Sequence, residues 1–205
     1  MVNEVIESHG TDLPSAWVQR WSHLVRPGGV VLDVACGQGR HARWFYERNH
    51  TLALVDRSQS AIEFIAIPAH ACEAVVADIE NGPWPFAGRR FDAVVVTNYL
   101  WRPLMPTLLD SLAPGGVMIY ETFAQGNETV GKPSRLDFLL RPGELLGVCR
   151  DLRIVAFEDG FQNGRPGQTP RFVQRIAAVR EIPQVANTGD RAAPGKPGPV
   201  RYFLP

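Results

Sequence analysis

The sequence predicts a single α/β domain in which a mostly parallel β-sheet is covered by helices on both faces. Short apolar runs alternate with stretches of helical periodicity from about residue 14 to about residue 120. No tight hairpin turn separates successive runs in this part of the chain, and antiparallel neighbours would need one. The 205 residues are enough for one domain with a substantial core and too few for two ordinary ones.

The first predicted element is an amphipathic helix over residues 14–25. Four apolar side chains recur at intervals of three and four residues, at Leu13, Trp17, Trp21 and Leu24. Pro14 suits the first turn of a helix, and Pro27-Gly28-Gly29 ends the pattern. We interpret the two tryptophans as core residues.

The next elements alternate between strand and helix. Strands are predicted over residues 30–34, 51–55, 74–77, 91–97 and 117–120, and helices from about residue 40, from about residue 58 and, broken by prolines, over 100–112. Pro114-Gly115-Gly116 is interpreted as the turn before the last of these strands. The runs are almost continuously apolar, which is typical of strands buried on both faces.

The C-terminal third is organised differently. Residues 121–141 read as a long loop, 143–149 as a short helix, and 152–157 and 172–179 as two strands. The link 158–171 is too short for a helical crossover, so these two strands should pair antiparallel. Residues 182–205 are rich in proline and glycine and lack periodicity, which predicts a domain over 1–181 followed by an extended tail over 182–205.

The composition argues against several classes of partner. Lys plus Arg and Asp plus Glu number 21 each, so no net charge would attract nucleic acid or an anionic membrane. No apolar run approaches the roughly 18 to 20 residues of a membrane-spanning helix. The stretch MVNEVIESHG contains neither the basic segment nor the apolar run that we would expect of an export signal, and the three cysteines lack metal-ligand spacing. We therefore expect a cytoplasmic protein without a metal site.

The stretch "VLDVACGQGRHARWF", residues 31–45, predicts a ligand-binding turn between a buried strand and a helix. Gly37 and Gly39 fit the dinucleotide pattern G-x-G-x-x-G/A, but the carboxylate of Asp33 would repel a pyrophosphate. A ligand that carries an ammonium and a sulfonium would instead be stabilised by that carboxylate. S-adenosylmethionine is such a ligand. We interpret Cys36 as a packing residue and His41 as a residue of the helix face.

Two further acids follow later strands. Asp56 stands 23 residues after Asp33, where a carboxylate can accept both ribose hydroxyls, a feature that fits NAD equally well. Asp78 follows the third strand, where it can accept the adenine amino group while the Ile79 N–H meets a ring nitrogen. A single aspartate after a strand is more often a turn or cap residue, so the argument depends on all three acids together.

These segments resemble the class I S-adenosylmethionine-dependent methyltransferases over about residues 14 to 180. "VLDVACGQGR" is similar to the family's first motif, "LALVDRS" to its ribose-binding segment, "VVADIE" to its adenine-binding segment, and "FDAVVVTNYL" and "LAPGGVMIYE" to its fourth and fifth strands. The resemblance implies a Rossmann-like fold, with a seven-stranded, mostly parallel sheet whose last strand is antiparallel. It also implies cofactor contacts from Asp33, Ala35, Gly37, Gly39, Arg40, Asp56, Arg57, Asp78, Ile79 and Asn98. Ala35 stands where the family often has glycine.

Within that family, the tellurite-resistance type of small-molecule methyltransferase is the most similar. The likeness rests on "DFLLRPGELLGVCRDLRIVAFED", residues 137–159, and on "RFVQRIAAVR" near the end of the domain. A histidine-arginine pair that this group carries before its last strand is not evident, and Gln162, Asn163 and Arg165 stand there instead.

The acceptor should lie at the ends of the fourth and fifth strands, near Asn98, Tyr99, Glu121 and Thr122. We interpret Tyr99 as a base or orienting group and Asn98 as part of the cleft near the methyl group. Glu121 and Arg135 flank a polar segment that is able to orient a small acceptor. The predicted function is methyl transfer to a small molecule; the alternatives are a non-catalytic cofactor-binding module of the same fold and an NAD(P)-dependent oxidoreductase.

Overall fold

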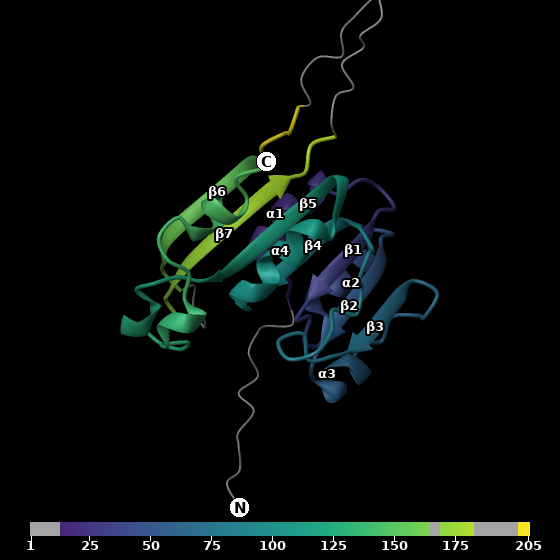
Figure 1. The fold of residues 1–205 in the computed structure, drawn as a ribbon, viewed down its shortest axis with the longest axis horizontal. Coiled ribbons are helices and arrows are strands. Elements are labelled where there is room, and N and C mark those ends of the chain that lie inside the picture. Colours follow the sequence, from purple (N-terminus) through teal and green to yellow (C-terminus); the bar gives the residue numbers. More distant parts are fainter. Residues whose placement is uncertain (1–12, 165–168, 183–200) are drawn as a thin grey trace, which may run out of the picture.

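The computed structural model describes residues 13–164, 169–182 and 201–205. Its centre is a seven-stranded sheet in the order β3-β2-β1-β4-β5-β7-β6 (Figure 1). The strands are β1 (Val30–Val34), β2 (Thr51–Asp56), β3 (Cys72–Val76), β4 (Phe91–Thr97), β5 (Leu112–Phe123), β6 (Arg153–Gln162) and β7 (Arg171–Val179). β1 to β5 are parallel to one another, whereas β7 pairs antiparallel with both β5 and β6. The predicted seven-stranded sheet and its antiparallel last strand are therefore confirmed.

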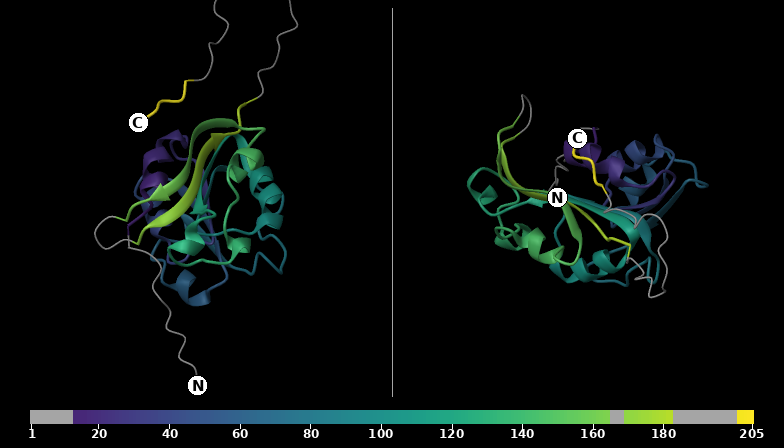
Figure 2. Two further views of the ribbon diagram at one scale, coloured as in Figure 1. Left: turned by 90° about the vertical axis from the view of Figure 1, so that its left-hand side faces the viewer. Right: turned by 90° about the horizontal axis from the view of Figure 1, so that it is seen from above.

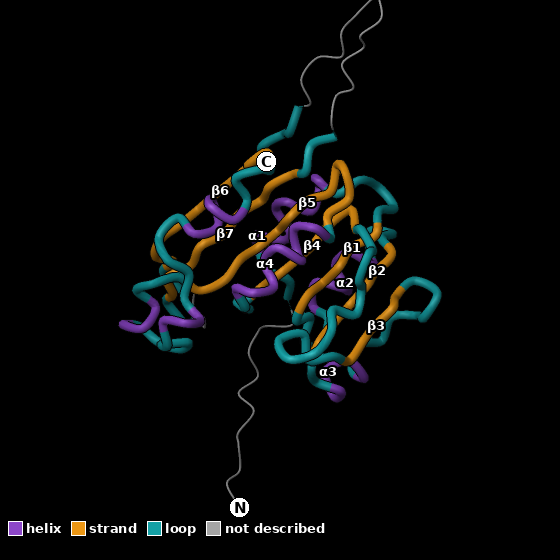
Figure 3. The backbone as a smooth tube through the Cα atoms, viewed as in Figure 1, coloured by secondary structure: helices purple, strands orange, loops and turns teal. Residues whose placement is uncertain are grey.

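Helices cover both faces of the sheet, as Figure 2 shows in the view from above. They are α1 (Ala16–Trp21), α2 (Arg40–Tyr46), α3 (Gln59–Glu63), α4 (Met105–Asp110) and α5 (Glu144–Val148), and Figure 3 shows them against the strands and loops. One buried cluster joins α1 and α2 to the sheet and the other joins α4 and α5 to it. Every residue of β4 is buried, as its continuous apolar run predicts.

The first helix is shorter than predicted. It begins at Ala16, and the Oγ of Ser15 caps it by accepting a hydrogen bond from the Trp17 backbone N–H at 3.1 Å. Pro14 therefore precedes the helix, because the cap residue keeps an extended backbone. The chain continues after Trp21 as a short 3-10 helix, Ser22–Leu24. Trp17 and Trp21 are 2% and 1% exposed, which confirms them as core residues.

Pro114-Gly115-Gly116 lies inside β5 and does not form a turn before it. Phe91 of β4 pairs with Leu112, but Ala93 pairs with Val117, so the segment between the two pairs bulges out of the ladder. Gly115 has φ +81°, a conformation that favours glycine. The prediction of a turn was wrong because a bulge uses the same residue types.

The segment predicted as a loop over 121–141 is partly ordered. β5 runs to Phe123, so Glu121 is a strand residue, and two short 3-10 helices follow at Asn127–Thr129 and Leu136–Phe138. The buried side chain of Asn127 holds this segment, since its Nδ2 donates to the Pro133 carbonyl and its Oδ1 accepts from the Phe172 N–H.

The two C-terminal strands are longer than predicted, because pairing with β7 extends β6 as far as Gln162. Most of the predicted tail lies outside the described residues, as do residues 1–12 and Arg165. Within the described part of the chain, no helix has the length and apolar character that crossing a membrane requires.

Candidate functional site

The glycine turn lies between β1 and α2, at the edge of the sheet where the parallel strands end. The arrows of β1 and β3 point to this edge, in the lower part of Figure 1. Ala35, Gly37 and Gly39 all have positive φ, at +53°, +52° and +73°. A Cβ atom built on Gly37 would meet no atom within 4 Å, so the backbone faces open space. A backbone of this shape can bring its N–H groups directly against a ligand.

Asp56, at the end of β2, is tied to this turn. Its Oδ2 accepts a hydrogen bond of 2.8 Å from the Gly37 backbone N–H, and its Oδ1 accepts one of 2.8 Å from the Ser58 N–H. An ionised carboxylate has further lone pairs beyond these two bonds. Asp56 can therefore shape the turn and still accept hydrogen bonds from a ligand.

Asp33 is a buried carboxylate on β1, only 1% exposed. Among the described residues, none donates a hydrogen bond to its Oδ2. Burial raises the pKa of Asp33 to about 7, while the nearby Arg40 guanidinium opposes the increase and Asp56 adds to it. An unpaired buried carboxylate costs free energy, and such a group is typical of a site that awaits a donor or a cation.

Arg40 and Arg57 are the two predicted cofactor residues with a positive charge. Arg40 begins α2 and is half-buried, and its Nη2 lies 3.4 Å from the Thr97 Oγ1 at the end of β4. Burial lowers the pKa of Arg40, and the carboxylates of Asp33 and Glu121 oppose that decrease. Arg57 follows β2 and is exposed. Arg40 thus lies between the glycine turn and the ends of β4 and β5.

Asp78 differs from the other two acids. It is exposed, two residues beyond the end of β3, and its oxygens accept from the backbone N–H groups of Glu80 and Asn81 and from the Asn81 Nδ2. The Asn81 hydrogen bond is the largest cause of a pKa below the ordinary value for Asp78. This is the geometry of a turn-capping aspartate. Ile79, beside it, packs against the core on the α4 side.

The three residues predicted for the acceptor side do not form one cluster. The Tyr99 ring packs against the core under α4, whereas Glu121 belongs to the buried network around Ser15 and Arg175 on the α1 side. The Arg135 side chain is 72% exposed and pairs with Asp137 at 3.0 Å. Asn98, the remaining residue near the strand ends, is exposed with φ +54° and donates its backbone N–H to the Glu121 carbonyl.

Tyr99 and Glu121 are both constrained chemically. The Tyr99 hydroxyl is buried and makes no hydrogen bond of good geometry among the described residues; burial raises its pKa, and the nearby Glu80 carboxylate adds to the increase. The phenol therefore stays protonated near neutral pH and is suited to donating a hydrogen bond, not to acting as a base. Glu121 is 2% exposed and accepts from the Ser15 Oγ and the Arg175 Nη1, each at 2.9 Å, with the Arg171 Nη2 at 3.7 Å.

Sequence reasoning missed Ser15, His41 and Arg175 as neighbours of the candidate site. His41, on α2, is 2% exposed and accepts a hydrogen bond from the Ser15 N–H at 3.2 Å, so it lies on the buried face of the helix. The position of His41 directly after Gly39-Arg40 was the one feature of the sequence that could have indicated its place beside the site. Its partners are too distant in the sequence for periodicity to reveal them.

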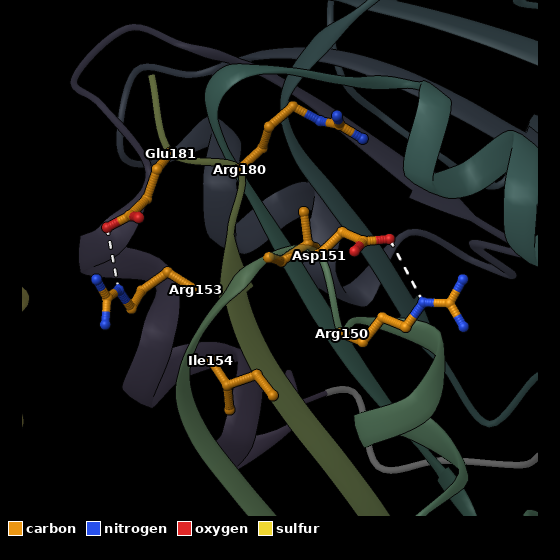
Figure 4. Close-up of a pocket in the computed structure, with 7 residues that line it drawn as sticks. Arg150, Asp151, Arg153, Ile154, Arg180 and Glu181 are labelled. Carbon is orange, nitrogen blue, oxygen red and sulfur yellow. Dashed lines mark hydrogen bonds and ion pairs between the residues drawn. The ribbon is translucent and has the colours of Figure 1, made fainter. Parts of the chain in front are cut away.

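A pocket of ≈ 430 Å³ lies at the opposite edge of the sheet, where β6 begins and β7 ends (Figure 4). Arg153 lies 3.0 Å from Glu181 there, and Arg150 lies 3.6 Å from Asp151. These charges pair with each other, and the pocket is remote from the glycine turn. The described residues also contain no cluster of three or more His, Cys, Asp or Glu side chains that could hold a metal ion.

Comparisons with known proteins match the part of the chain that contains the glycine turn and the fold around it. Residues 31–116, from β1 to the bulge of β5, match the family model described as a methyltransferase domain. Comparison with curated protein sequences gave no match.

Several solved structures share the fold. TehB from Haemophilus influenzae superposes with a TM-score of 0.68 at 16% identity, over 82% of this chain and 63% of that chain, so this chain spans less than two thirds of TehB. A TehB-like methyltransferase from Corynebacterium glutamicum gives 0.57 at 16% identity, over 79% of this chain and 85% of the other. The glycopeptide N-methyltransferase MtfA, in complex with S-adenosylhomocysteine, gives 0.56 at 17% identity, over 81% and 88%. The strand order and these solved structures show that the chain has the fold of the class I S-adenosylmethionine-dependent methyltransferases, and residues 31–116 match a methyltransferase-domain model.

Proposed function

We propose that this chain transfers a methyl group from S-adenosylmethionine to a small-molecule acceptor. The observation that carries the proposal is the buried carboxylate of Asp33, which lies next to the glycine turn and to Arg40 and accepts no hydrogen bond at its Oδ2 from the residues that the structure describes. The methionine end of the cofactor carries both an ammonium and a carboxylate. Asp33 can pair with the ammonium and Arg40 with the carboxylate. Charge-assisted hydrogen bonds of this kind are strong in a partly dry site.

The rest of the cofactor fits the remaining residues. Asp56 has lone pairs left for the ribose hydroxyls, and the open space beside the Gly37 backbone leaves room for close approach. For adenine, the Ile79 backbone N–H is a better candidate than the Asp78 carboxylate, which already accepts three hydrogen bonds within its own turn. Arg57 is exposed beside this turn, and its charge helps to lower the pKa of Asp78.

When bound, S-adenosylmethionine supplies an activated methyl group and a neutral leaving group. The task of the chain is then to align the acceptor and to exclude water, effects that can amount to several kcal/mol. Tyr99 and Asn98, after β4, and Arg135 are the proposed contacts for the acceptor. Tyr99 would donate a hydrogen bond through its protonated phenol, and Glu121 would orient arginines without removing a proton.

A small acceptor is supported by the kinds of protein that share the fold. One of these neighbours, MtfA, is a glycopeptide N-methyltransferase, and others are TehB or TehB-like proteins. We also propose a cytoplasmic location, because Cys36, Cys72 and Cys149 are all free thiols.

Calorimetry with S-adenosylmethionine, S-adenosylhomocysteine and NADH tests the cofactor, with micromolar binding expected for the first two only. A screen of thiols, phenols, carboxylic acids and chalcogen oxyanions with methyl-labelled cofactor then tests transfer. Transfer to any of them supports the enzyme. Binding without transfer would favour the non-catalytic module, and binding of NADH alone would favour an oxidoreductase, which Asp33 argues against.

A further inference from the structure

His41, in the first turn of α2, lies between two groups that the sequence places far apart. Its Nε2 accepts a hydrogen bond of 3.2 Å from the backbone N–H of Ser15. Its Nδ1 lies 3.9 Å from the Oδ2 of Asp33, to which no group in the described part of the chain donates a hydrogen bond. A neutral imidazole that accepts at Nε2 must carry its proton on Nδ1. The N–H of the ring therefore faces the buried carboxylate.

The ring is held in this neutral state. Burial lowers the pKa of His41 to about 3, and the neighbouring Arg40 adds to the decrease. The side chain is 2% exposed, so water does not compete for either nitrogen. The ring thus offers Asp33 a fixed dipole and no charge of its own.

Ser15 is fixed in turn by three other elements. Its Oγ donates to the Glu121 Oε1 at 2.9 Å and accepts from the Trp17 N–H at 3.1 Å. Glu121 also accepts from the Arg175 Nη1 at 2.9 Å, and the Arg175 guanidinium lies 5.0 Å from the centre of the Trp17 ring. The start of α1 is therefore anchored to β5 and β7, which gives the Ser15 backbone N–H a single direction.

We infer that Ser15 and His41 are positioning residues for Asp33: Ser15 orients the imidazole, whose Nδ1–H stabilises the ionised carboxylate and leaves its Oδ2 free for the ammonium of a bound ligand. At 3.9 Å the ring is too far away to occupy the lone pair with a hydrogen bond, yet close enough for its dipole to act in a buried environment. The identity of the ammonium as that of S-adenosylmethionine rests on the function proposed above.

Other groups face Asp33 from the neighbouring elements. Arg40 on α2 favours the ionised form, and Asp56 on β2 opposes it. Cys36 in the turn and Cys72 on β3 are also near Asp33. Burial raises the pKa of both thiols, and the charge of Asp33 adds to the increase, so both are neutral at pH 7. Glu121 on β5 acts on Arg40. Against this background, loss of the imidazole N–H should raise the pKa of Asp33 further.

The direct test is titration of the Asp33 carboxyl carbon by NMR in the cofactor-free protein. In the wild type we expect a midpoint near pH 7. His41→Phe keeps a ring but removes the N–H, and its midpoint should rise by about one pH unit. His41→Asn keeps an amide donor near the position of Nδ1 and should restore most of the wild-type midpoint. Equal midpoints in all three proteins would overturn the inference.

Two further measurements separate positioning from simple packing. The ring nitrogen shifts of His41 should be those of a neutral Nδ1–H tautomer that does not titrate above about pH 4; a protonated ring or the other tautomer at neutral pH would contradict the inference. His50→Phe is the matched control, since His50 is also buried but bonds through Nδ1 to the Gly29 carbonyl at the other edge of the sheet. It should leave the Asp33 midpoint unchanged, and a shift equal to that of His41→Phe would overturn the inference.

Cofactor binding gives a second readout. If the midpoint of Asp33 rises by about one unit, the affinity of His41→Phe for S-adenosylmethionine at pH 7 should be about fivefold below that of the wild type. At about pH 9, where Asp33 is ionised in both proteins, the two affinities should be equal. Ser15→Ala loses the hydrogen bond to Glu121, so its affinity at pH 7 should fall by less than that of His41→Phe. Ser15→Thr keeps the hydroxyl and should bind as the wild type does. Wild-type protein that fails to bind S-adenosylmethionine would contradict the proposed function, while the NMR titration would still decide the roles of His41 and Ser15.

Discussion

The carboxylate of Asp56 accepts a hydrogen bond of 2.8 Å from the backbone N–H of Gly37. This contact joins the end of β2 to the turn after β1. The residue assigned to the ribose therefore also shapes the backbone against which the ligand would lie. Effects of changing Asp56 should be larger than the loss of a ligand contact alone.

Asp56→Ala should weaken binding of S-adenosylmethionine by at least about 1 to 3 kcal/mol, because the ribose hydroxyls lose an ionised acceptor and the Gly37 N–H loses its partner. Calorimetry measures the change. Asp78→Ala is the comparison: its carboxylate caps an exposed turn, so the loss of affinity should be smaller. Unchanged affinity in Asp56→Ala would contradict the assignment.

Gly37→Val should abolish cofactor binding in a folded protein. The added side chain meets no protein atom within 4 Å but enters the space above the turn, and the positive φ costs about 1 to 2 kcal/mol. Gly28→Val is a matched control, because Gly28 has φ +68° and open space but lies before β1, at the other edge of the sheet. Circular dichroism and calorimetry should show similar stability for the two variants and a loss of binding only in Gly37→Val.

Asp33→Asn should stabilise the cofactor-free protein at alkaline pH while removing its affinity for S-adenosylmethionine. The folded-state pKa of about 7 lies above the ordinary value of 3.8, so ionisation destabilises the fold. This penalty is absent at low pH, grows as the pH rises above about 4 and is complete above about 7. Denaturation at pH 8 should show a gain of up to about 4 kcal/mol that disappears near pH 4. A gain that does not depend on pH would point to packing instead.

Arg102→Ala should destabilise residues 136–145, the segment whose backbone carbonyls and Glu144 side chain accept hydrogen bonds from Arg102. The guanidinium donates two hydrogen bonds to Glu144 and one each to the carbonyls of Asp137 and Leu139, at 2.7 to 2.9 Å. We expect a loss of about 1 to 3 kcal/mol and faster hydrogen exchange over residues 136–145. Arg150→Ala breaks an exposed pair and should cost less than about 0.5 kcal/mol. Equal effects would show that the Arg102 contacts do not order this segment.

Tyr99→Phe tests the acceptor side without disturbing the fold. Its buried hydroxyl has no partner among the described residues, so removing it should leave stability unchanged or slightly higher. Once an acceptor is found, the rate of transfer should fall while affinity for the cofactor stays within about twofold. Arg135→Ala should raise the apparent Michaelis constant for the acceptor. If neither variant alters turnover, the acceptor contacts lie elsewhere, with Arg171 the next residue to change.

The sequence by itself determined the architecture and the position of the candidate site. The apolar runs matched β1, β2 and β4 within a residue, and the short link after residue 158 correctly implied that β6 and β7 are antiparallel. The glycine turn with Asp33 and Asp56 was visible because local periodicity and turn residues specify where strands end. Parallel strands bring those ends to one edge, so the chain order of the acids was enough to predict where the candidate site lies.

Only the tertiary structure decided the burial and the hydrogen-bond partners of each acid. Asp33 is buried and its Oδ2 accepts no hydrogen bond from the described residues, whereas Asp78 caps its own exposed turn, although both lie at the ends of apolar runs. The contact of Ser15 with Glu121 spans 106 residues of sequence, and that of Ser15 with His41 spans 26. Burial and hydrogen-bond partners are set by elements that pack from distant parts of the chain, and local pattern carries no information about them. The chemical state of Asp33 is therefore a property of the packed α1, α2 and sheet together, because desolvation and nearby dipoles govern its charge.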